Sequence, residues 1–174
     1  MSEQGIKVAV VGASGYTGQE LLRLLVMHPR VDLVAVTSRQ EAGKKLTDLF
    51  PRLRGAEGTE SLTFMDPDID AIVETGAKFA FLALPHGVAS EYAVPLLDRG
   101  LRIIDLSADF RLRSKTVYEE FYGDPHPAPQ LLARAVFGHP ELYGEGIKGA
   151  DLVASPGCYP TSILTPLVPL VKAG

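Results

Sequence analysis

The sequence predicts an α/β protein built on an open, doubly wound parallel sheet. Two patterns lead to this prediction. Short β-branched apolar runs alternate with segments of helical periodicity, and the first run ends in a glycine-rich turn that opens a helix. Ligands of such sheets bind at the carboxyl ends of the strands. The functional residues are therefore sought where the strands end.

The first part of the chain predicts a Rossmann-like βαβ unit. Residues 6–11 are a buried strand, residues 20–25 show helical spacing, and residues 31–37 are the second strand. Residues 38–58 are polar and predict a loop with a short helix near 46–50. The elements expected next are a short strand at 61–64, a short helix at 70–75, a strand at 79–84, a helix at 89–98 closed by Gly100, and a strand at 102–106.

The last part of the chain has a looser pattern. The elements expected there are a helix at 114–122 with Ser114 as its cap, an edge strand at 135–138, a helical turn at 140–143, a strand at 152–154 and an apolar helix at 163–172.

Composition limits the possible functions. The 174 residues are 46% hydrophobic and 22% charged, as in ordinary globular domains. A net charge of −4 without a basic stripe predicts no nucleic-acid partner. One cysteine rules out a disulfide framework and a cysteine zinc site, so we expect no metal and a reducing compartment. No signal peptide or bilayer-spanning run is visible, which predicts a cytoplasmic protein without a membrane partner.

The glycine-rich turn predicts a nucleotide site. Its spacing is G-x-x-G-x-x-G, and a strand before it and a helix after it are the context of a dinucleotide fingerprint. Such a turn brings the backbone close to a pyrophosphate that faces a helix N-terminus. A turn that binds nothing is the alternative. The residues predicted to bind cofactor here are Gly12, Ser14, Gly15, Tyr16, Thr17 and Gly18.

The end of the second strand favours NADP over NAD. An NAD site usually has an acidic residue there for the ribose 2′-hydroxyl. Here Ser38 and Arg39 follow the strand, and the first carboxylate is Glu41. A guanidinium pairs bidentately with a 2′-phosphate, so we expect Ser38 and Arg39 to bind it. A solvated surface arginine is the alternative.

Three residues at later strand ends complete the predicted cofactor site. Pro85, His86 and Ser107 follow the strands at 79–84 and 102–106. His86 is expected to line the nicotinamide end, with a hydrogen-bonded structural histidine as the alternative. Arg111 has two interpretations, a clamp for phosphate or carboxylate and an ion pair with a nearby aspartate, and the spacing alone favours the ion pair.

The single cysteine follows the last strand and a Pro156-Gly157 turn. We expect a helix to begin at or just after Cys158, with Pro160 tolerated in its first turn. The unpaired N–H groups at that helix end favour a thiolate, which is the nucleophilic form. A small buried hydrophobic residue is the alternative.

Five motifs stand out along the chain: Gly12-Ala13-Ser14-Gly15-Tyr16-Thr17-Gly18, Leu84-Pro85-His86-Gly87, Asp105-Leu106-Ser107-Ala108-Asp109-Phe110-Arg111, Val136-Phe137-Gly138-His139-Pro140-Glu141-Leu142 and Pro156-Gly157-Cys158-Tyr159-Pro160-Thr161. Taken together, these motifs resemble those of the N-acetyl-gamma-glutamyl-phosphate reductases. The resemblance covers nearly the whole chain, in the family's order, although Ser155 stands where the family often has Asn and His139 where it often has Leu.

The resemblance implies an NADP-dependent oxidoreductase of arginine biosynthesis. Such an enzyme reduces N-acetyl-L-glutamyl 5-phosphate to N-acetyl-L-glutamate 5-semialdehyde and releases phosphate. It implies that Cys158 is the catalytic residue and forms a thioester, that NADPH supplies the hydride, and that Arg111 holds the phosphate. The partners implied are the small-molecule acyl phosphate and phosphate, with a homo-oligomer for the full-length protein.

The resemblance also implies a division of the chain. Residues 1–157 are expected to form the NADP-binding domain. Residues 158–174 are expected to begin a helix that leads into a second, α+β substrate domain, which carries the catalytic histidine and is missing from this chain. We therefore expect the 174 residues to bind NADP(H) with little turnover. A related reductase of aspartyl or aminoadipyl phosphates and a non-catalytic NADP-binding module are the alternatives.

Overall fold

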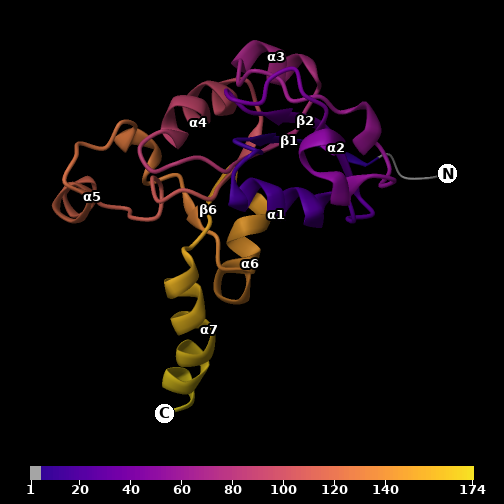
Figure 1. Ribbon diagram of the computed structural model, residues 1–174. Coiled ribbons are helices and arrows are strands. Elements are labelled where there is room, and N and C mark those ends of the chain that lie inside the picture. Colours follow the sequence, from indigo (N-terminus) through magenta and orange to yellow (C-terminus); the bar gives the residue numbers. More distant parts are fainter. Residues whose placement is uncertain (1–4) are drawn as a thin grey trace.

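The fold is known from a computed structural model that describes residues 5–174. Within these residues a six-stranded sheet has the order β2-β1-β3-β4-β6-β5 (Figure 1), and its ladders are parallel. The prediction of an open, doubly wound parallel sheet is confirmed. The strands are β1 (Ile6–Val11), β2 (Val31–Thr37), β3 (Phe79–Leu82), β4 (Arg102–Asp105), β5 (Val136–Phe137) and β6 (Leu152–Ala154).

The helices begin and end at local sequence signals. The Asp68 side chain accepts a hydrogen bond from Ala71 N at the start of α3, and Ser114 accepts one from Val117 N at the start of α5. The predicted Ser114 cap is therefore confirmed. The α-helices are α1 (Tyr16–Leu25), α2 (Leu46–Leu49), α3 (Ile69–Glu74), α4 (Ala89–Asp98), α5 (Lys115–Tyr122), α6 (Pro140–Gly149) and α7 (Cys158–Ala173).

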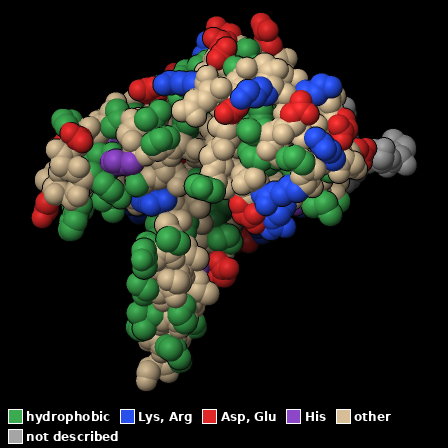
Figure 2. All heavy atoms as spheres, in the orientation of Figure 1, with side chains coloured by type: hydrophobic (Ala, Val, Ile, Leu, Met, Phe, Trp, Pro, Cys, Tyr) green, Lys and Arg blue, Asp and Glu red, His purple; other side chains and the backbone are tan. Residues whose placement is uncertain are grey.

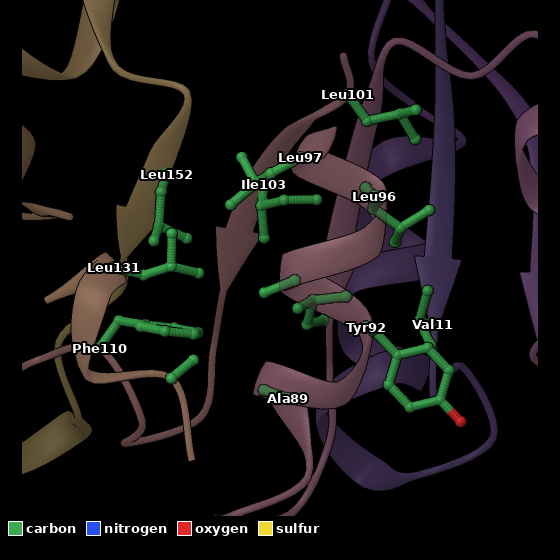
Figure 3. Close-up of a cluster of buried hydrophobic side chains, with 14 of the residues drawn as sticks. Val11, Ala89, Tyr92, Leu96, Leu97, Leu101, Ile103, Phe110, Leu131 and Leu152 are labelled. Carbon is green, nitrogen blue, oxygen red and sulfur yellow. The ribbon is translucent and has the colours of Figure 1, made fainter. Parts of the chain in front are cut away.

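Both faces of β1 are buried from Val8 to Val11, which explains why these four residues are all apolar. Val8 and Val10 belong to a core that includes side chains of α1 and α2, whereas Ala9 and Val11 belong to a core with side chains of α3 and α4. Successive strand residues point to opposite faces, so one strand supplies both cores. Figure 3 shows part of the second core, where Val11 lies beside the α4 side chains.

Several predicted bounds are off by one or two residues, as at β3 and β4, which end at Leu82 and Asp105, and two predicted elements differ more strongly. Residues 61–64 are not a strand, because Thr63 and Met65 form only single bridges, to Lys45 and Thr37. The turn predicted at 140–143 is the start of the longer helix α6, which is kinked at Tyr143 (φ −128°). The glycines in the rest of α6 have low helix propensity, and they hid this helix in the sequence.

Helix α7 projects from the rest of the protein (Figure 1) and has no buried residue. It begins at Cys158, as expected, and continues through the predicted helix at 163–172. Apolar side chains cover much of its visible surface (Figure 2). Among residues 5–174, no helix has both the length and the apolar character that a membrane span needs. The large exposed apolar residues of α7 are Tyr159, Ile163, Leu167, Leu170 and Val171.

Candidate cofactor and cysteine site

The carboxyl ends of β1, β2, β3 and β4 surround one cavity. β2 is the neighbour of β1 on one edge and β3 is its neighbour on the other, so the direction of the strand order reverses at β1. Open α/β sheets bind their ligands at such a switch point. The cavity has a volume of about 500 Å³. Its lining residues are Gly12, Ser14, Gly15, Tyr16, Thr17, Ser38, Arg39, Gln40, Ala83, Leu84, Pro85 and Leu106.

The three glycines of the turn have different structural roles. Gly12 has φ +80°, and a Cβ there would lie 2.5 Å from the Ala83 carbonyl oxygen. Gly18 does not line the cavity, and a Cβ there would lie 2.7 Å from the Ala13 backbone, so Gly18 allows α1 to approach β1. Gly15 is the N-cap of α1, and its ideal Cβ meets nothing closer than Gly12 O at 3.9 Å. The exposed backbone at Gly15 fits a pyrophosphate.

The Ser38 hydroxyl is used within the protein. It lies 2.8 Å from the Ser14 hydroxyl and accepts hydrogen bonds from the backbone N–H groups of Gln40 and Glu41. Ser38 is also buried. It therefore holds the turn after β2 against the glycine-rich turn and contributes shape to the cavity.

Arg39 lines both this cavity and a smaller neighbouring one of about 220 Å³. Its Nη2 donates a hydrogen bond of 2.9 Å to the Tyr92 hydroxyl, and 69% of its side chain is exposed. Glu41, the first carboxylate after β2, pairs instead with Lys44 at 2.6 Å and lines neither cavity. The cationic group at the rim is thus Arg39.

His86 does not line the cavity. Its Nδ1 lies 3.1 Å from Asp109 Oδ1 and its Nε2 lies 3.2 Å from the Tyr118 hydroxyl, while its ring packs on Tyr122 at 4.4 Å. Burial, together with the charge of Asp109, raises the pKa of Tyr118 to about 12, so the phenol keeps its proton. The structure therefore places His86 against α5 as a hydrogen-bonded residue, which is the alternative stated above.

Ser107 also lies outside the cavity lining. Its hydroxyl donates to Asp105 Oδ2 at 2.8 Å and accepts from the Asp109 backbone N–H at 3.0 Å. Asp109 in turn accepts hydrogen bonds from Gly87 N and Ser90 N, which fixes the loop before α4. Ser107 thus helps to hold the turns beside the site.

Arg111 connects the cavity to the cysteine loop. Its Nη2 donates to Leu106 O at 2.9 Å, and its Nε donates to Ser155 O at 2.8 Å. Leu106 lines the cavity, and Ser155 precedes Cys158 in the turn. Among residues 5–174, Arg111 forms no ion pair with an aspartate, contrary to the preference from its spacing. The remaining nitrogen of Arg111, Nη1, lies close to Gly157, since a Cβ added to Gly157 would be 3.1 Å from it.

Cys158 is an exposed free thiol at the first residue of α7. The preceding Gly157 is extended (φ −69°, ψ 166°) and forms the N-cap. In this structure Cys158 is therefore not the small buried hydrophobic residue of the alternative. In the described part of the chain, no three His, Cys, Asp or Glu side chains are grouped so as to hold a metal ion.

Some lining residues were not predicted. Gln40, Ala83, Leu84 and Leu106 line the larger cavity. They follow β2, β3 and β4 directly, so the rule that ligands bind at strand ends was the available signal. Tyr92 was not predicted either, because it lies in the middle of an amphipathic helix and reads as a core residue.

Comparisons with known proteins agree with this fold. Residues 7–150 match the family described as the semialdehyde dehydrogenase NAD-binding domain. Over 96% of this chain and 47% of the other, the fold is similar to that of an aspartate semialdehyde dehydrogenase from Candida albicans solved with NADP, with a TM-score of 0.68 and 19% identity.

Curated relatives give a closer match in sequence. The N-acetyl-gamma-glutamyl-phosphate reductase of Akkermansia muciniphila is 62% identical over 97% of this chain and 48% of its own length. That of Rhodopirellula baltica is 47% identical over 100% of this chain and 49% of its own length. The chain spans about half the length of these relatives, and their names confirm the resemblance found in the sequence. By its matched residues and its fold, this chain belongs to the semialdehyde dehydrogenase NAD-binding domain family.

Proposed function

We propose that this chain binds NADP(H) at the switch point and supplies the nucleophile of a cytoplasmic acyl-phosphate reductase of arginine biosynthesis. The substrate is N-acetyl-L-glutamyl 5-phosphate, and the products are N-acetyl-L-glutamate 5-semialdehyde and phosphate. One observation carries the proposal: a single arginine joins the wall of the cofactor-sized cavity to the loop of an exposed thiol. The names of the relatives support the choice of substrate.

The cavity fits a dinucleotide. The φ +80° at Gly12 turns the chain sharply, and the open approach at Gly15 leaves room for a pyrophosphate beside the start of α1. Tyr16 and Thr17 lie in the first turn of that helix and line the same cavity. When bound, NADPH supplies a hydride.

Cys158 performs the covalent step. Its sulfur, as the thiolate, attacks the acyl carbon, a C–S bond forms, and the C–O bond to phosphate breaks, so the phosphate leaves with the electron pair. With the hydride that bound NADPH would supply, the thioester carbon would become the aldehyde carbon, and the C–S bond would break to return Cys158 as the thiolate. A thioester divides one difficult substitution into two easier steps. Nη1 of Arg111, beside Gly157, is the group we assign to the departing phosphate.

The preference for NADP is tested by Arg39→Ala. We expect the Kd for NADPH to rise about ten-fold, because a charge-assisted pair with the 2′-phosphate is lost, while the Kd for NADH stays nearly constant. Fluorescence titration of the reduced cofactors measures both constants. Arg54→Ala removes the same charge from an exposed side chain outside both cavities and serves as the matched control. An equal loss for both cofactors would remove the 2′-phosphate argument.

The substrate is tested by assay of the reverse reaction with NADP⁺ and phosphate. The full-length protein is expected to oxidise N-acetylglutamate semialdehyde and not aspartate or aminoadipate semialdehyde. We assign residues 158–174 to a second unit. The 174 residues alone are therefore expected to bind the cofactor and to turn over slowly. The exposed apolar surface of α7 and the twofold length of the relatives support this division. Preference for another semialdehyde would overturn the substrate, and brisk turnover by the 174 residues would overturn the division.

A further inference from the structure

Tyr92 has its ring in the core and its hydroxyl at the rim of the cofactor site. The residue is 6% exposed and packs in the cluster that contains Val11 and Leu96. Figure 3 shows its hydroxyl oxygen pointing away from the other labelled core side chains. This oxygen accepts the hydrogen bond from Arg39 Nη2 at 2.9 Å. Because close packing fixes the ring, the hydroxyl has a fixed position.

Arg39 needs such a fixed partner. Its side chain is 69% exposed, and a free arginine loses rotamer entropy when a ligand orders it. Tyr92 belongs to α4, whereas Arg39 follows β2, so their hydrogen bond joins two elements that border the same small cavity. The bond holds the guanidinium at that cavity before any ligand arrives.

The chemistry of the partner is also significant. A phenol orients the guanidinium without neutralising its charge, whereas a carboxylate would compete with an anionic ligand. Glu91 Oε2 forms an exposed ion pair with the same Nη2 at 3.9 Å, which is too long for a hydrogen bond and does not fix the direction of the guanidinium. Tyr92 is therefore the group that sets the direction of Arg39.

The smaller cavity has the character of an adenosine site. Its volume is about 220 Å³, and Pro67, Leu84 and Val88 are among its walls. A flat purine is held by apolar surfaces of this kind, and a phosphate on its ribose is held by a guanidinium at the edge.

We propose that Tyr92 is a positioning residue for cofactor choice. Its hydroxyl holds Arg39 at the adenosine cavity in the orientation that binds a 2′-phosphate, and so favours NADP(H) over NAD(H). The proposal rests on the assignment of this site to NADP(H) under the proposed function. Tyr92 acts on the phosphate only through Arg39.

Tyr92→Phe tests the proposal, since it removes one oxygen and keeps the ring in the core. The ligands are NADPH, NADH and the fragments 2′,5′-ADP and ADP. We expect the Kd values of NADPH and 2′,5′-ADP to rise about five-fold, the order expected for loss of one net hydrogen bond, and those of NADH and ADP to stay nearly constant. A merely structural role would change all four constants together. Tyr143→Phe, on α6 outside both cavities, is the matched control.

The double variant separates the two proposals. Tyr92→Phe added to Arg39→Ala is expected to cause no further loss of NADPH affinity, because both substitutions break the same contact. Additive losses, or a Tyr92→Phe variant that keeps full NADPH affinity while Arg39→Ala loses it, would overturn the role of Tyr92 and leave the NADP site intact. If Arg39→Ala itself does not change the preference, the proposed NADP site fails.

Discussion

At the scale of single residues, the most perturbed acid of the site is Asp105. It is fully buried at the end of β4, and burial raises its pKa to about 6, although the N–H and hydroxyl of Ser107 partly oppose this effect. Its backbone oxygen accepts a hydrogen bond from Ser155 N at 2.8 Å. Asp105 therefore joins the loop of Ser107 to the loop of the cysteine, and it destabilises the fold when it is ionised.

The destabilising effect of ionised Asp105 predicts that the free energy of unfolding depends on pH. Between pH about 4 and about 6, folded Asp105 binds a proton that the unfolded chain releases, so its contribution to stability falls as the pH rises through that window. Asp105→Asn removes this slope. The free energy of unfolding of the variant, relative to wild type, is expected to rise by about 3 kcal/mol from pH about 4 to about 7. Urea titrations across this range measure it.

Asp151→Asn is the control for this experiment. The hydrogen bond from Arg134 lowers the pKa of Asp151, so this carboxylate contributes stability that is lost as the pH falls, and its slope has the opposite sign. The free energies of unfolding of wild type and Asp105→Asn could instead run parallel from acid to neutral pH. That result would show that burial does not destabilise the ionised form of Asp105.

At the scale of elements, two glycines of the β1–α1 turn have different roles. Gly18 allows close packing of α1 on β1, whereas Gly15 leaves space for a ligand. Gly18→Ala places a methyl 2.7 Å from the Ala13 backbone, and relieving that overlap is expected to cost about 1–3 kcal/mol of unfolding free energy. Gly15→Ala meets no such contact and loses only the N-cap preference for glycine, so its stability is expected to fall less than that of Gly18→Ala, while its methyl obstructs the pyrophosphate and weakens NADPH binding. Thermal unfolding and cofactor titration of both variants check this. Equal stability of the two variants would contradict the packing role of Gly18.

Local signals in the sequence predicted most elements. The bounds of β1, β2 and α4 agree with the structure, because apolar period, glycine stops and caps are encoded within a few neighbouring residues. The hydrogen-bond partners of His86 could not be predicted from the sequence. Asp109 and Tyr118 come from later segments, and only the folded sheet brings them near. The bonds of Arg111 to backbone carbonyls have no side-chain signature in the sequence at all.

At the scale of the whole molecule, one sheet edge carries both the proposed cofactor cavity and the loop of the proposed nucleophile. β4 lies between β3 and β6 in the sheet, so the cavity beside Leu106 and the loop that leads to Cys158 are neighbours across a single strand. Two hydrogen bonds hold the loop that leads to Cys158 beside the end of β4. Arg111 donates to Ser155 O, and the Ser155 N–H donates to Asp105 O. The proposed function therefore depends on the nicotinamide end of the cofactor reaching toward the thiol.

Alkylation of Cys158 by iodoacetamide, with and without saturating NADP⁺, tests that dependence most directly. The chain has one cysteine, so mass spectrometry reports its modification alone. The exposed thiol is expected to react at neutral pH, and NADP⁺ is expected to slow the reaction, with half-protection at its own Kd and at a higher concentration in Arg39→Ala. A rate that saturating NADP⁺ leaves unchanged would contradict a shared site for the thiol and the cofactor.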